Sequence, residues 1–374
     1  MGQSQNATRQ EEIKPLKIVL FIGHHKVGST SLQHYLGAKA PSLLREGILY
    51  PAVEELGLAR LASPFEVKLP SRLMLNVNEA HNGLAFSILR RNSQKPMPKI
   101  HRRLPAPEVM LERIRRQIEL YKPKCLVLVS EVFSHFGRAD SDAIQYLLSP
   151  FQSEDITICA ILRRPDEHLA SWFAQRLRFG HSPPFPKDAP LTKGIHLNYR
   201  QMIEPWLKDL PNARLTLMNY QDVLSKGGTT EHFLSIIGRE HQVVDTRLTR
   251  KNVSPHSALF RIAHCANQAL DPKDATKIFK TLENLGQELT LPPKDQIELF
   301  GAKKRKLLLR RFRPANEYLS ELTQKDFFPD LEQIGQPKPL AEIDVARRAL
   351  AQIQSDFMPL FPRSIRPWLS TLSF

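Results

Sequence analysis

Short, mostly apolar runs rich in β-branched residues recur along the first two thirds of the chain. The four clearest are residues 17–22 (KIVLFI), 125–129 (CLVLV), 156–162 (ITICAIL) and 214–218 (RLTLM). Runs of this length, with little alternation of polar residues, are typical of strands buried on both faces of a parallel sheet. The pattern therefore predicts at least four buried strands.

Helical patterns separate these runs. An amphipathic segment follows the first run, through Leu32, Tyr35 and Leu36, and further segments span about 166–178 and 229–237. Strands joined by stretches too long for hairpins favour a parallel sheet with right-handed crossovers. We therefore predict an α/β fold: a three-layer, P-loop-like parallel sheet flanked by helices, with helical and loop-rich insertions.

The same pattern divides the chain into three parts. Residues 1–14 are polar and predict a disordered lead-in. Residues 15–330 form the expected α/β domain, with an insertion at about 56–120. Its proline-dotted part, 56–108, suggests an irregular structure. Residues 331–374 predict a helical C-terminal extension.

A loop rich in glycine and hydroxyl side chains joins the first apolar run to the first helix. It reads Gly-His-His-Lys-Val-Gly-Ser-Thr-Ser over residues 23–31. Backbone N–H groups in such a loop, together with the helix N-terminus, attract anions. Gly28 allows close backbone approach, Lys26 adds a positive charge, and the three hydroxyl residues add donors.

This loop differs from the phosphate loop of nucleotide triphosphatases and kinases. That motif needs Gly-Lys-Ser/Thr, whereas here Gly28 is followed by Ser29. A kinase also places an Asp for Mg²⁺ beside the phosphates. The two later buried runs are followed instead by Ser130-Glu131 and Arg163-Arg164. A nucleotide kinase is therefore the less favoured alternative.

A second polar motif follows the run at 156–162. Arg163 stands at the predicted strand end, Pro165 two residues later, and Ser171 eight residues after the arginine. Proline suits the first helical turn because its missing N–H has no partner there. A guanidinium binds phosphate through two parallel hydrogen bonds. An arginine in this position can bind a phosphate, although Arg163 and Arg164 could instead cap the sheet edge.

Together the two motifs resemble those of sulfotransferases that use the donor PAPS, especially bacterial members acting on polysaccharides and other carbohydrates. The resemblance implies that the 5′-phosphosulfate lies against Lys26, Val27, Gly28, Ser29, Thr30 and Ser31. It implies that Lys26 contacts the departing oxygen, and that Arg163 and Ser171 bind the 3′-phosphate. A basic segment, Arg250, Lys251 and Asn252, would close over that phosphate. PAP would be the product, and no metal would be required.

The base that accepts the acceptor's proton is a separate question. Glu131 ends a predicted strand, where open α/β sheets form their binding crevice. It is the first candidate, with His135, His25 and Glu46 as rivals. His25 could also orient Lys26 or contact the sulfate. A protein of the same fold that binds nucleotide or another anion without catalysis remains open.

The charge balance is strongly basic, at +15, and two segments carry much of it. Residues 90–124 hold eleven Lys or Arg against three acids, and 303–313 hold seven with no acid. Such runs are either solvated helix faces or a groove for an anionic glycan. No nucleic-acid-binding motif accompanies them, so no specific nucleic acid is expected.

The remaining features concern location and assembly. The start of the chain is polar, and the first apolar run is too short to cross a bilayer. We therefore expect a cytoplasmic protein without a transmembrane segment. The apolar tail, which contains Phe357, Phe361, Trp368 and Phe374, could support a homodimer.

Overall fold

Five parallel strands form the centre of the computed structural model, which describes residues 15–63, 75–91, 97–98, 101, 103–190, 198–239 and 255–374. The predicted lead-in, residues 1–14, lies outside these ranges. The strands are β1 (Lys17–Phe21), β2 (Ile48–Leu49), β3 (Cys125–Val129), β4 (Ile156–Leu162) and β5 (Arg214–Asn219). Their spatial order is β2-β3-β1-β4-β5. The four predicted strands and the α/β fold are confirmed, and the short strand β2 is an addition.

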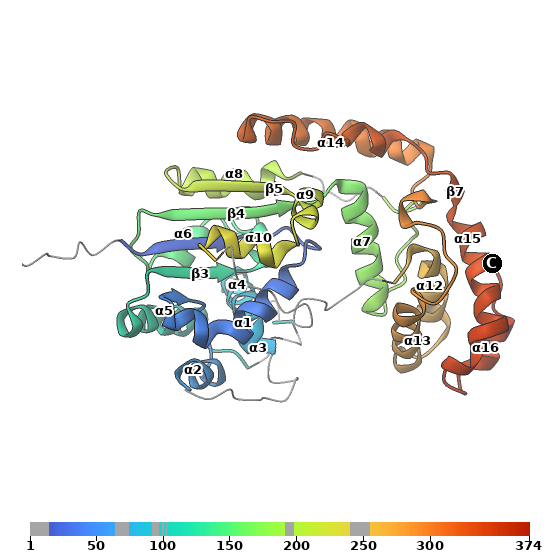
Figure 1. Cartoon of the computed structure of the whole chain (residues 1–374), viewed down its shortest axis with the longest axis horizontal. Coiled ribbons are helices and arrows are strands. Elements are labelled where there is room, and N and C mark those ends of the chain that lie inside the picture. The colour runs from blue at the N-terminus through green and yellow to red at the C-terminus, as the bar shows by residue number, and fades with distance from the viewer. Residues whose placement is uncertain are drawn as a thin grey trace, which may run out of the picture.

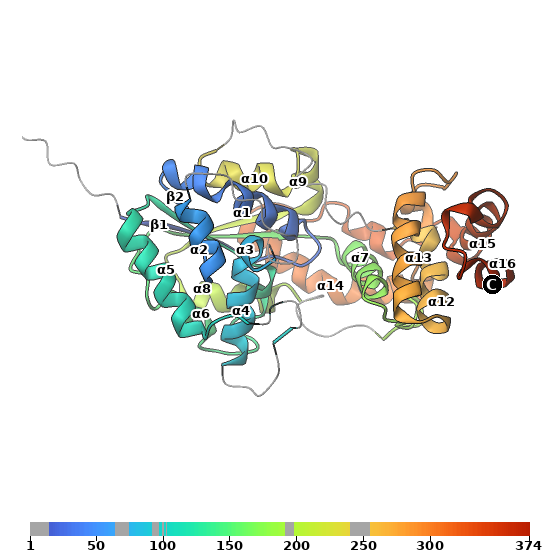
Figure 2. The ribbon, with the colours of Figure 1, turned by 90° about the horizontal axis from the view of Figure 1, so that it is seen from below.

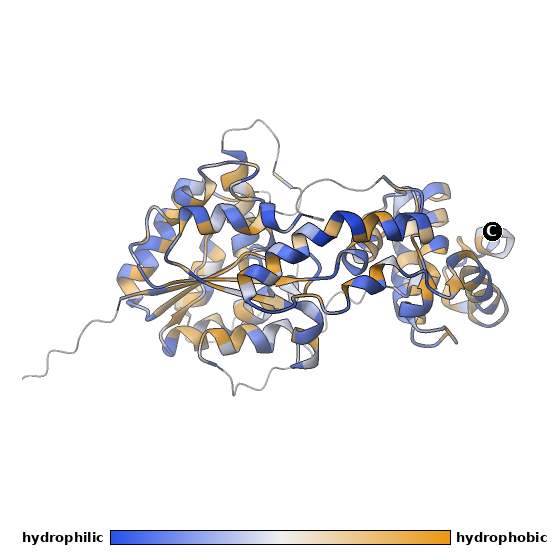
Figure 3. Ribbon diagram, turned by 90° about the horizontal axis from the view of Figure 1, so that it is seen from above, coloured by the Kyte–Doolittle hydropathy of each residue, from blue (hydrophilic) through white to orange (hydrophobic). Residues whose placement is uncertain are grey.

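Strand β1 lies in the middle of the sheet, which explains its continuous apolar sequence. It pairs in parallel with β3 on one side and with β4 on the other. Residues 18–21 are fully buried. Figure 3 shows apolar colouring along most of the sheet, while the surrounding helices alternate between polar and apolar positions. A central strand covered on both faces has no polar side to present.

Helices cover both faces of this sheet. Figure 2 shows α1 (Ser29–Arg45) and α10 (Thr229–Ile236) on one face, and α4 (Ala80–Arg90), α6 (Ala143–Leu148) and α8 (Arg200–Asp209) on the other. The other helices of this region are α2 (Glu55–Ala62), α3 (Leu75–Asn78), α5 (Pro107–Tyr121) and α9 (Tyr220–Ser225). The predicted irregularity of 56–108 is therefore wrong for its described part. Leu84 and Ile88, one helical turn apart, are fully buried there.

A helical region lies beyond the carboxyl ends of the strands (Figure 1). Helix α7 (Pro165–Arg178) leads from β4 into it, as the pattern at 166–178 predicted. Its other elements are α12 (Phe260–Ala269), α13 (Pro272–Leu285), β6 (Ile297–Glu298), α14 (Ala302–Thr323), β7 (Leu340–Ala341), α15 (Glu342–Gln352) and α16 (Arg366–Thr371). Helix α14 returns toward the sheet, where it contacts α8.

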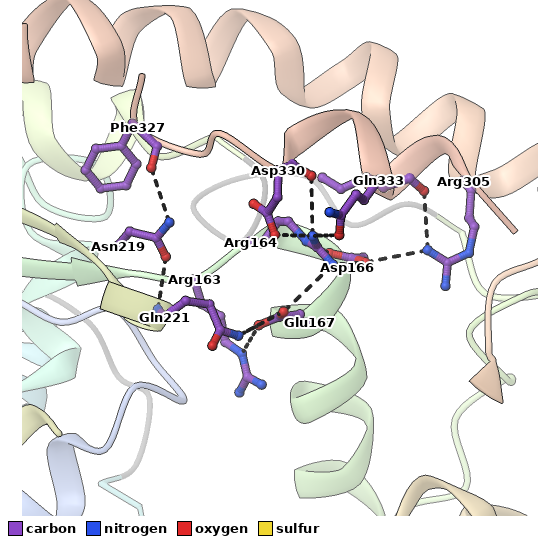
Figure 4. Close-up of polar contacts among 11 residues, drawn as sticks. Arg163, Arg164, Asp166, Glu167, Asn219, Gln221, Arg305, Phe327, Asp330 and Gln333 are labelled. Atoms are coloured by element: carbon purple, nitrogen blue, oxygen red, sulfur yellow. Dashed lines mark hydrogen bonds and ion pairs between the residues drawn. The ribbon is translucent and has the colours of Figure 1, made fainter. Parts of the chain in front are cut away.

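Buried ion pairs connect this helical region to the end of β4 (Figure 4). Arg164 Nε donates to Asp166 Oδ1 at 2.9 Å, and its Nη1 to Asp330 Oδ2 at 2.5 Å. Arg305 of α14 lies 2.6 Å from Glu298 and 3.5 Å from Asp166. Because a buried charge must be paired, these contacts commit Arg164 to a structural role.

Candidate active site

The β1–α1 loop, residues 22–28, lies at the carboxyl edge of the sheet between β1 and β4. Its first part continues the pairing with β4, because Ile161 forms backbone hydrogen bonds of 2.8 and 2.9 Å with it. The chain then turns through Lys26 (φ 66°) and Gly28 (φ 87°), both left-handed. Helix α1 starts directly afterwards, and its N-cap residue, Gly28, has no side chain that could cap the first turn. The loop predicted to bind an anion therefore lies at a strand end, next to the N-terminal N–H groups of a helix.

Gly28 has two reasons to be glycine, its positive φ and its close approach to α10. A Cβ there would lie 3.0 Å from Thr229 Oγ1, and the Thr229 hydroxyl donates to the Val27 carbonyl. We expect Gly28→Ala to lower the free energy of unfolding by about 1–2 kcal/mol from the backbone alone, and by more because of Thr229. Gly180→Ala is the matched control for chemical denaturation. Gly180 also has a positive φ, but a Cβ added there would have no neighbouring atom within 4 Å. Equal losses in the two variants would contradict the packing argument.

Lys26 lies among several other cations. Burial, followed by the charges of Arg178 and Arg163, lowers the pKa of its amine to about 8, against opposing effects of Glu131 and Glu283. Arg178 itself pairs with Glu283 of α13. An ammonium in such surroundings gains more from an added anion than an isolated surface lysine does.

Arg163 connects the two predicted motifs. Its Nη1 donates to the Lys26 carbonyl at 3.5 Å, and its Nε donates to Glu167 Oε2 at 3.1 Å. The guanidinium also lies over the Tyr220 ring, 5.0 Å from the centroid. The Tyr199 hydroxyl donates to the Arg163 carbonyl and fixes the backbone at this strand end. The two arginines predicted together thus separate: Arg164 is bound within the fold, while Arg163 faces the loop.

The second turn of α7 lies beside the same loop. Pro165 occupies the first helical position, as predicted, and Ser171 follows six residues later in a half-buried position. The next residue, Trp172, has its ring 5.8 Å from that of His25. The helical turn that carries Ser171 is therefore adjacent to the loop.

Glu131 approaches the loop from β3. It opens the 3₁₀ helix η2 (Glu131–His135), and its Cα would lie 3.2 Å from a Cβ at Gly23. Its carboxylate accepts hydrogen bonds from Gln33 Nε2 at 3.0 Å and Asn82 Nδ2 at 3.5 Å. Burial raises the pKa of this carboxyl, and the charge of Glu79 raises it further. A carboxylate with these properties is suited to accept a proton near neutral pH.

Two histidines, one from the loop and one from η2, contact each other. His25 Nε2 and His135 Nε2 lie 3.1 Å apart, so one ring donates its proton to the other. His24, fully buried, has its Nδ1 3.2 Å from the His25 carbonyl. Lys26, His25, His135 and Glu131 thus come from two neighbouring strand ends.

Glu46, the remaining candidate base, is placed elsewhere. It follows the last residue of α1 and pairs with Arg239. The backbone of the adjacent Gly47 accepts hydrogen bonds from the start of β3. A 17-residue helix is about 25 Å long, so Glu46 lies at the opposite edge of the sheet from Lys26.

Several residues around the site carried no sequence signal. Gln33 and Asn82 are buried beside Glu131, and Glu79 lies behind them. Arg178 and Lys294 add positive charge to the site. Burial lowers the pKa of the Lys294 amine, and the charge of Arg163 lowers it further. Their positions depend on how α1, α4, α7 and the segment before β6 pack. The predicted segment Arg250, Lys251 and Asn252 lies outside the described residues.

Many cations of the two basic runs are paired within the fold. On α5, Arg113 pairs with Glu55 at 2.8 Å, and Arg116 with Glu112 at 2.8 Å. On α14, Arg313 pairs with Glu332 at 2.8 Å. These pairs favour solvated, compensated helix faces over a continuous binding groove. Exposed Lys303, Lys306, Arg310 and Arg311 remain on α14.

Among the described residues, no group of three or more His, Cys, Asp or Glu side chains could hold a metal ion. None of the described helices has the length and apolar character needed to cross a bilayer. Comparisons with protein-family models, curated proteins and solved structures found no match to this chain.

Proposed function

We propose that this protein is a sulfotransferase that moves a sulfuryl group from PAPS to a hydroxyl or amine acceptor. The observation that carries the proposal is the meeting of the two motifs: the Arg163 guanidinium lies 3.5 Å from the Lys26 carbonyl. The motifs are 137 residues apart in sequence and join at neighbouring strand ends. In addition, the chain passes from β1 to β2 and β3 on one side of the sheet, whereas from β4 it passes to β5 on the other side. Ligands of open α/β sheets bind at such a switch point.

The residues present fit a donor with two separate phosphate groups. Residues 26–31 supply an ammonium, hydroxyl groups and the N-terminus of α1 for the phosphosulfate. Arg163 supplies a second positive centre for the 3′-phosphate, with Ser171 on the adjacent helix. The lowered pKa of Lys26 reflects burial among cations, so a bound anion would relieve their mutual repulsion.

The donor supplies the sulfuryl group, and the chain's own residues handle the proton and the developing charge. Glu131 takes the proton from the acceptor as the new bond to sulfur forms. Lys26 faces the phosphate oxygen that receives the electron pair of the broken S–O bond. Donors placed where charge develops lower the barrier more than they strengthen substrate binding.

The proposed acceptor class is a carbohydrate. The half-buried Trp172 ring beside His25 offers an apolar face of the kind that packs against a sugar ring. Exposed cations on α14 would attract an acidic glycan, and this attraction would weaken as salt rises. An acceptor KM that stays constant with salt would count against an anionic glycan.

The direct test is incubation of the purified chain with ³⁵S-labelled PAPS and a panel of glycans, phenols and amino-alcohols. Labelled product from a carbohydrate is the expected result. ATP labelled at its γ-phosphate is run in parallel, and phosphate transfer would establish the kinase alternative. PAP binding without transfer would indicate a non-catalytic protein, and no binding of PAPS or PAP would overturn the proposal.

Arg163→Ala should chiefly weaken binding of the donor nucleotide. Loss of a charge-assisted hydrogen bond corresponds to about 1.5–3 kcal/mol, so Kd for PAP should rise on the order of 10- to 150-fold in titration calorimetry. Arg163→Lys should lie in between, because it keeps the charge and loses the planar fork. Arg200→Ala is the control, since Arg200 is exposed and pairs with Glu204 on α8. An unchanged Kd in Arg163→Ala would remove this residue from the donor site.

A further inference from the structure

A buried network of side chains surrounds the carboxylate of Glu131. It contains two amides, Gln33 and Asn82, a second carboxylate, Glu79, and the Ser130 hydroxyl. The four residues other than Glu131 are each at least nine-tenths buried. They come from α1, from the residue that precedes α4, from α4 and from the end of β3, so the network exists only in the folded protein.

The hydrogen bonds determine how the Asn82 amide is oriented. The Val132 N–H donates to Ser130 Oγ at 3.0 Å, so the Ser130 hydroxyl donates its own proton to Asn82 Oδ1 at 2.6 Å. The NH₂ group of Asn82 therefore points the other way. It lies 3.1 Å from Glu79 Oε2 and 3.5 Å from Glu131 Oε1. One amide nitrogen thus donates to two carboxylates.

Gln33 contacts Glu131 from α1, and the Ser29 hydroxyl at the start of the same helix also hydrogen-bonds this carboxylate. Its Nε2 donates to Glu131 Oε2 at 3.0 Å and to Asn82 Oδ1 at 3.2 Å. Both oxygens of Glu131 are consequently held by amide donors, each from a different helix. A carboxylate held in this way has little rotational freedom. General-base catalysis benefits from such a fixed orientation.

The outer carboxylate, Glu79, is held by a histidine. His34 Nε2 lies 3.3 Å from Glu79 Oε1, and His34 Nδ1 lies 3.5 Å from Asn78 Nδ2. His34 Nε2 therefore donates to Glu79 and adds a hydrogen bond at the outer end of the network.

Other titratable groups face this pair from each packed element. Lys26 approaches Glu131 from the β1–α1 loop. Tyr50 follows β2, and burial raises the pKa of its hydroxyl, with further contributions from the charges of Glu79 and Glu131. Burial lowers the pKa of the His101 ring, and the charge of Glu79 opposes this effect. The charge of Glu131 raises the pKa of Lys26, so an anion in the donor site would also affect this carboxylate.

We infer that Gln33 and Asn82 are positioning residues for Glu131, and that Glu79 is a second carboxylate coupled to Glu131 through the Asn82 amide. This inference rests on the proposed function only in making Glu131 the base. The coupling adjusts the pH at which Glu131 accepts a proton, because two nearby carboxylates resist carrying charge together.

The test is the pH profile of Glu79→Gln, which removes the charge and keeps the shape. The acid limb of kcat for sulfuryl transfer should move to lower pH by on the order of one unit. Glu79→Asp should leave the limb nearly in place, because it retains the charge. Glu55→Gln, on the exposed surface of α2, is the control for a remote carboxylate. An acid limb that is the same in Glu79→Gln and wild type would overturn the coupling.

A second measurement does not depend on catalysis. ¹³C-NMR of glutamate labelled at Cδ follows the Glu131 carboxyl directly, with Glu131→Gln used to assign its signal. In the wild type, the signal of Glu131 should show two linked titration steps. A single-step curve for Glu131 would contradict the coupling even if Glu79→Gln fails to fold. Linked curves together with absence of sulfuryl transfer would retain the coupling and overturn the proposed function.

The positioning role has its own readout. Asn82→Ala and Gln33→Ala should lower kcat by about 10-fold or more while Kd for PAP stays the same, since neither side chain faces the donor cations. Gln33→Glu gives no donor to Glu131 and should not restore activity. A KM effect with unchanged kcat would show that these amides support binding and do not position the base.

Discussion

Lys26→Ala should reduce kcat for sulfuryl transfer by about 10²–10³-fold, the loss typical of removing one donor from a developing negative charge. Lys26 is placed for this effect by its left-handed backbone and by burial at the carboxyl edge of β1. Its charge is more effective there than in water, because the surrounding protein screens it less. Steady-state kinetics at saturating PAPS measure the loss.

The matched control is Lys39→Ala, an exposed lysine on the same helix that follows the loop. It should keep wild-type kcat and PAP affinity.

The pH dependence gives a second check, because the pKa of Lys26 is about 8 and the ammonium form is the active one. For the free enzyme, kcat/KM for the donor should fall as pH rises above about 8. This alkaline limb should disappear in Lys26→Arg, whose guanidinium stays charged. Wild-type kcat in Lys26→Ala would remove Lys26 from the mechanism.

The sheet was predictable because its central strands are buried on both faces. Continuous apolar sequences such as 156–162 leave few alternatives to a parallel strand. Strand β2 has two residues and is too short to form a pattern. Helices α2 and α4 were missed because the prolines that surround them suggested an irregular segment. Their buried residues, such as Leu84 and Ile88, become meaningful only once the sheet they cover is known.

The parts of the candidate site that lie at strand-to-helix junctions were predictable from the sequence. The loop around Lys26 and the residues from Arg163 to Pro165 follow predicted strands directly, so local sequence places them at one edge. Gln33 and Asn82 belong to helices and look like ordinary polar positions. Their contact with Glu131 depends on tertiary packing across 98 and 49 residues of sequence, which periodicity does not encode.

Arg164 shows a related limit. From sequence, Arg163 was the predicted phosphate contact, and the alternative was that both arginines cap the sheet edge. The structure separates them because Asp330 and Asp166 reach one guanidinium and the Lys26 carbonyl the other. Asp330 lies 166 residues away from its partner. A partner so distant in sequence gives no local sign of the ion pair.

Glu131→Gln should lower kcat by about 10²–10⁴-fold, the range expected when a general base is lost, while PAP binding stays near wild type. The pKa of Glu131 is raised by burial and by Glu79, so the wild-type kcat should fall as pH decreases through a value above the usual glutamate range. Below it the carboxyl is protonated and accepts no proton. The acid limb should be absent from the residual activity of Glu131→Gln.

The histidine pair supplies the comparison that decides between the candidate bases. His25 and His135 share one hydrogen bond of 3.1 Å beside the loop, so His135→Ala removes the partner of His25 without touching Glu131. If Glu131 is the base, His135→Ala should lower kcat far less than Glu131→Gln and keep the acid limb. A larger loss in His135→Ala, with an acid limb still present in Glu131→Gln, would transfer the role to the histidines.

The Glu131→Gln change also turns an NH₂ group toward an amide donor of Gln33 or Asn82, which costs about 1 kcal/mol. Calorimetry with PAP separates that structural cost from the loss of the base.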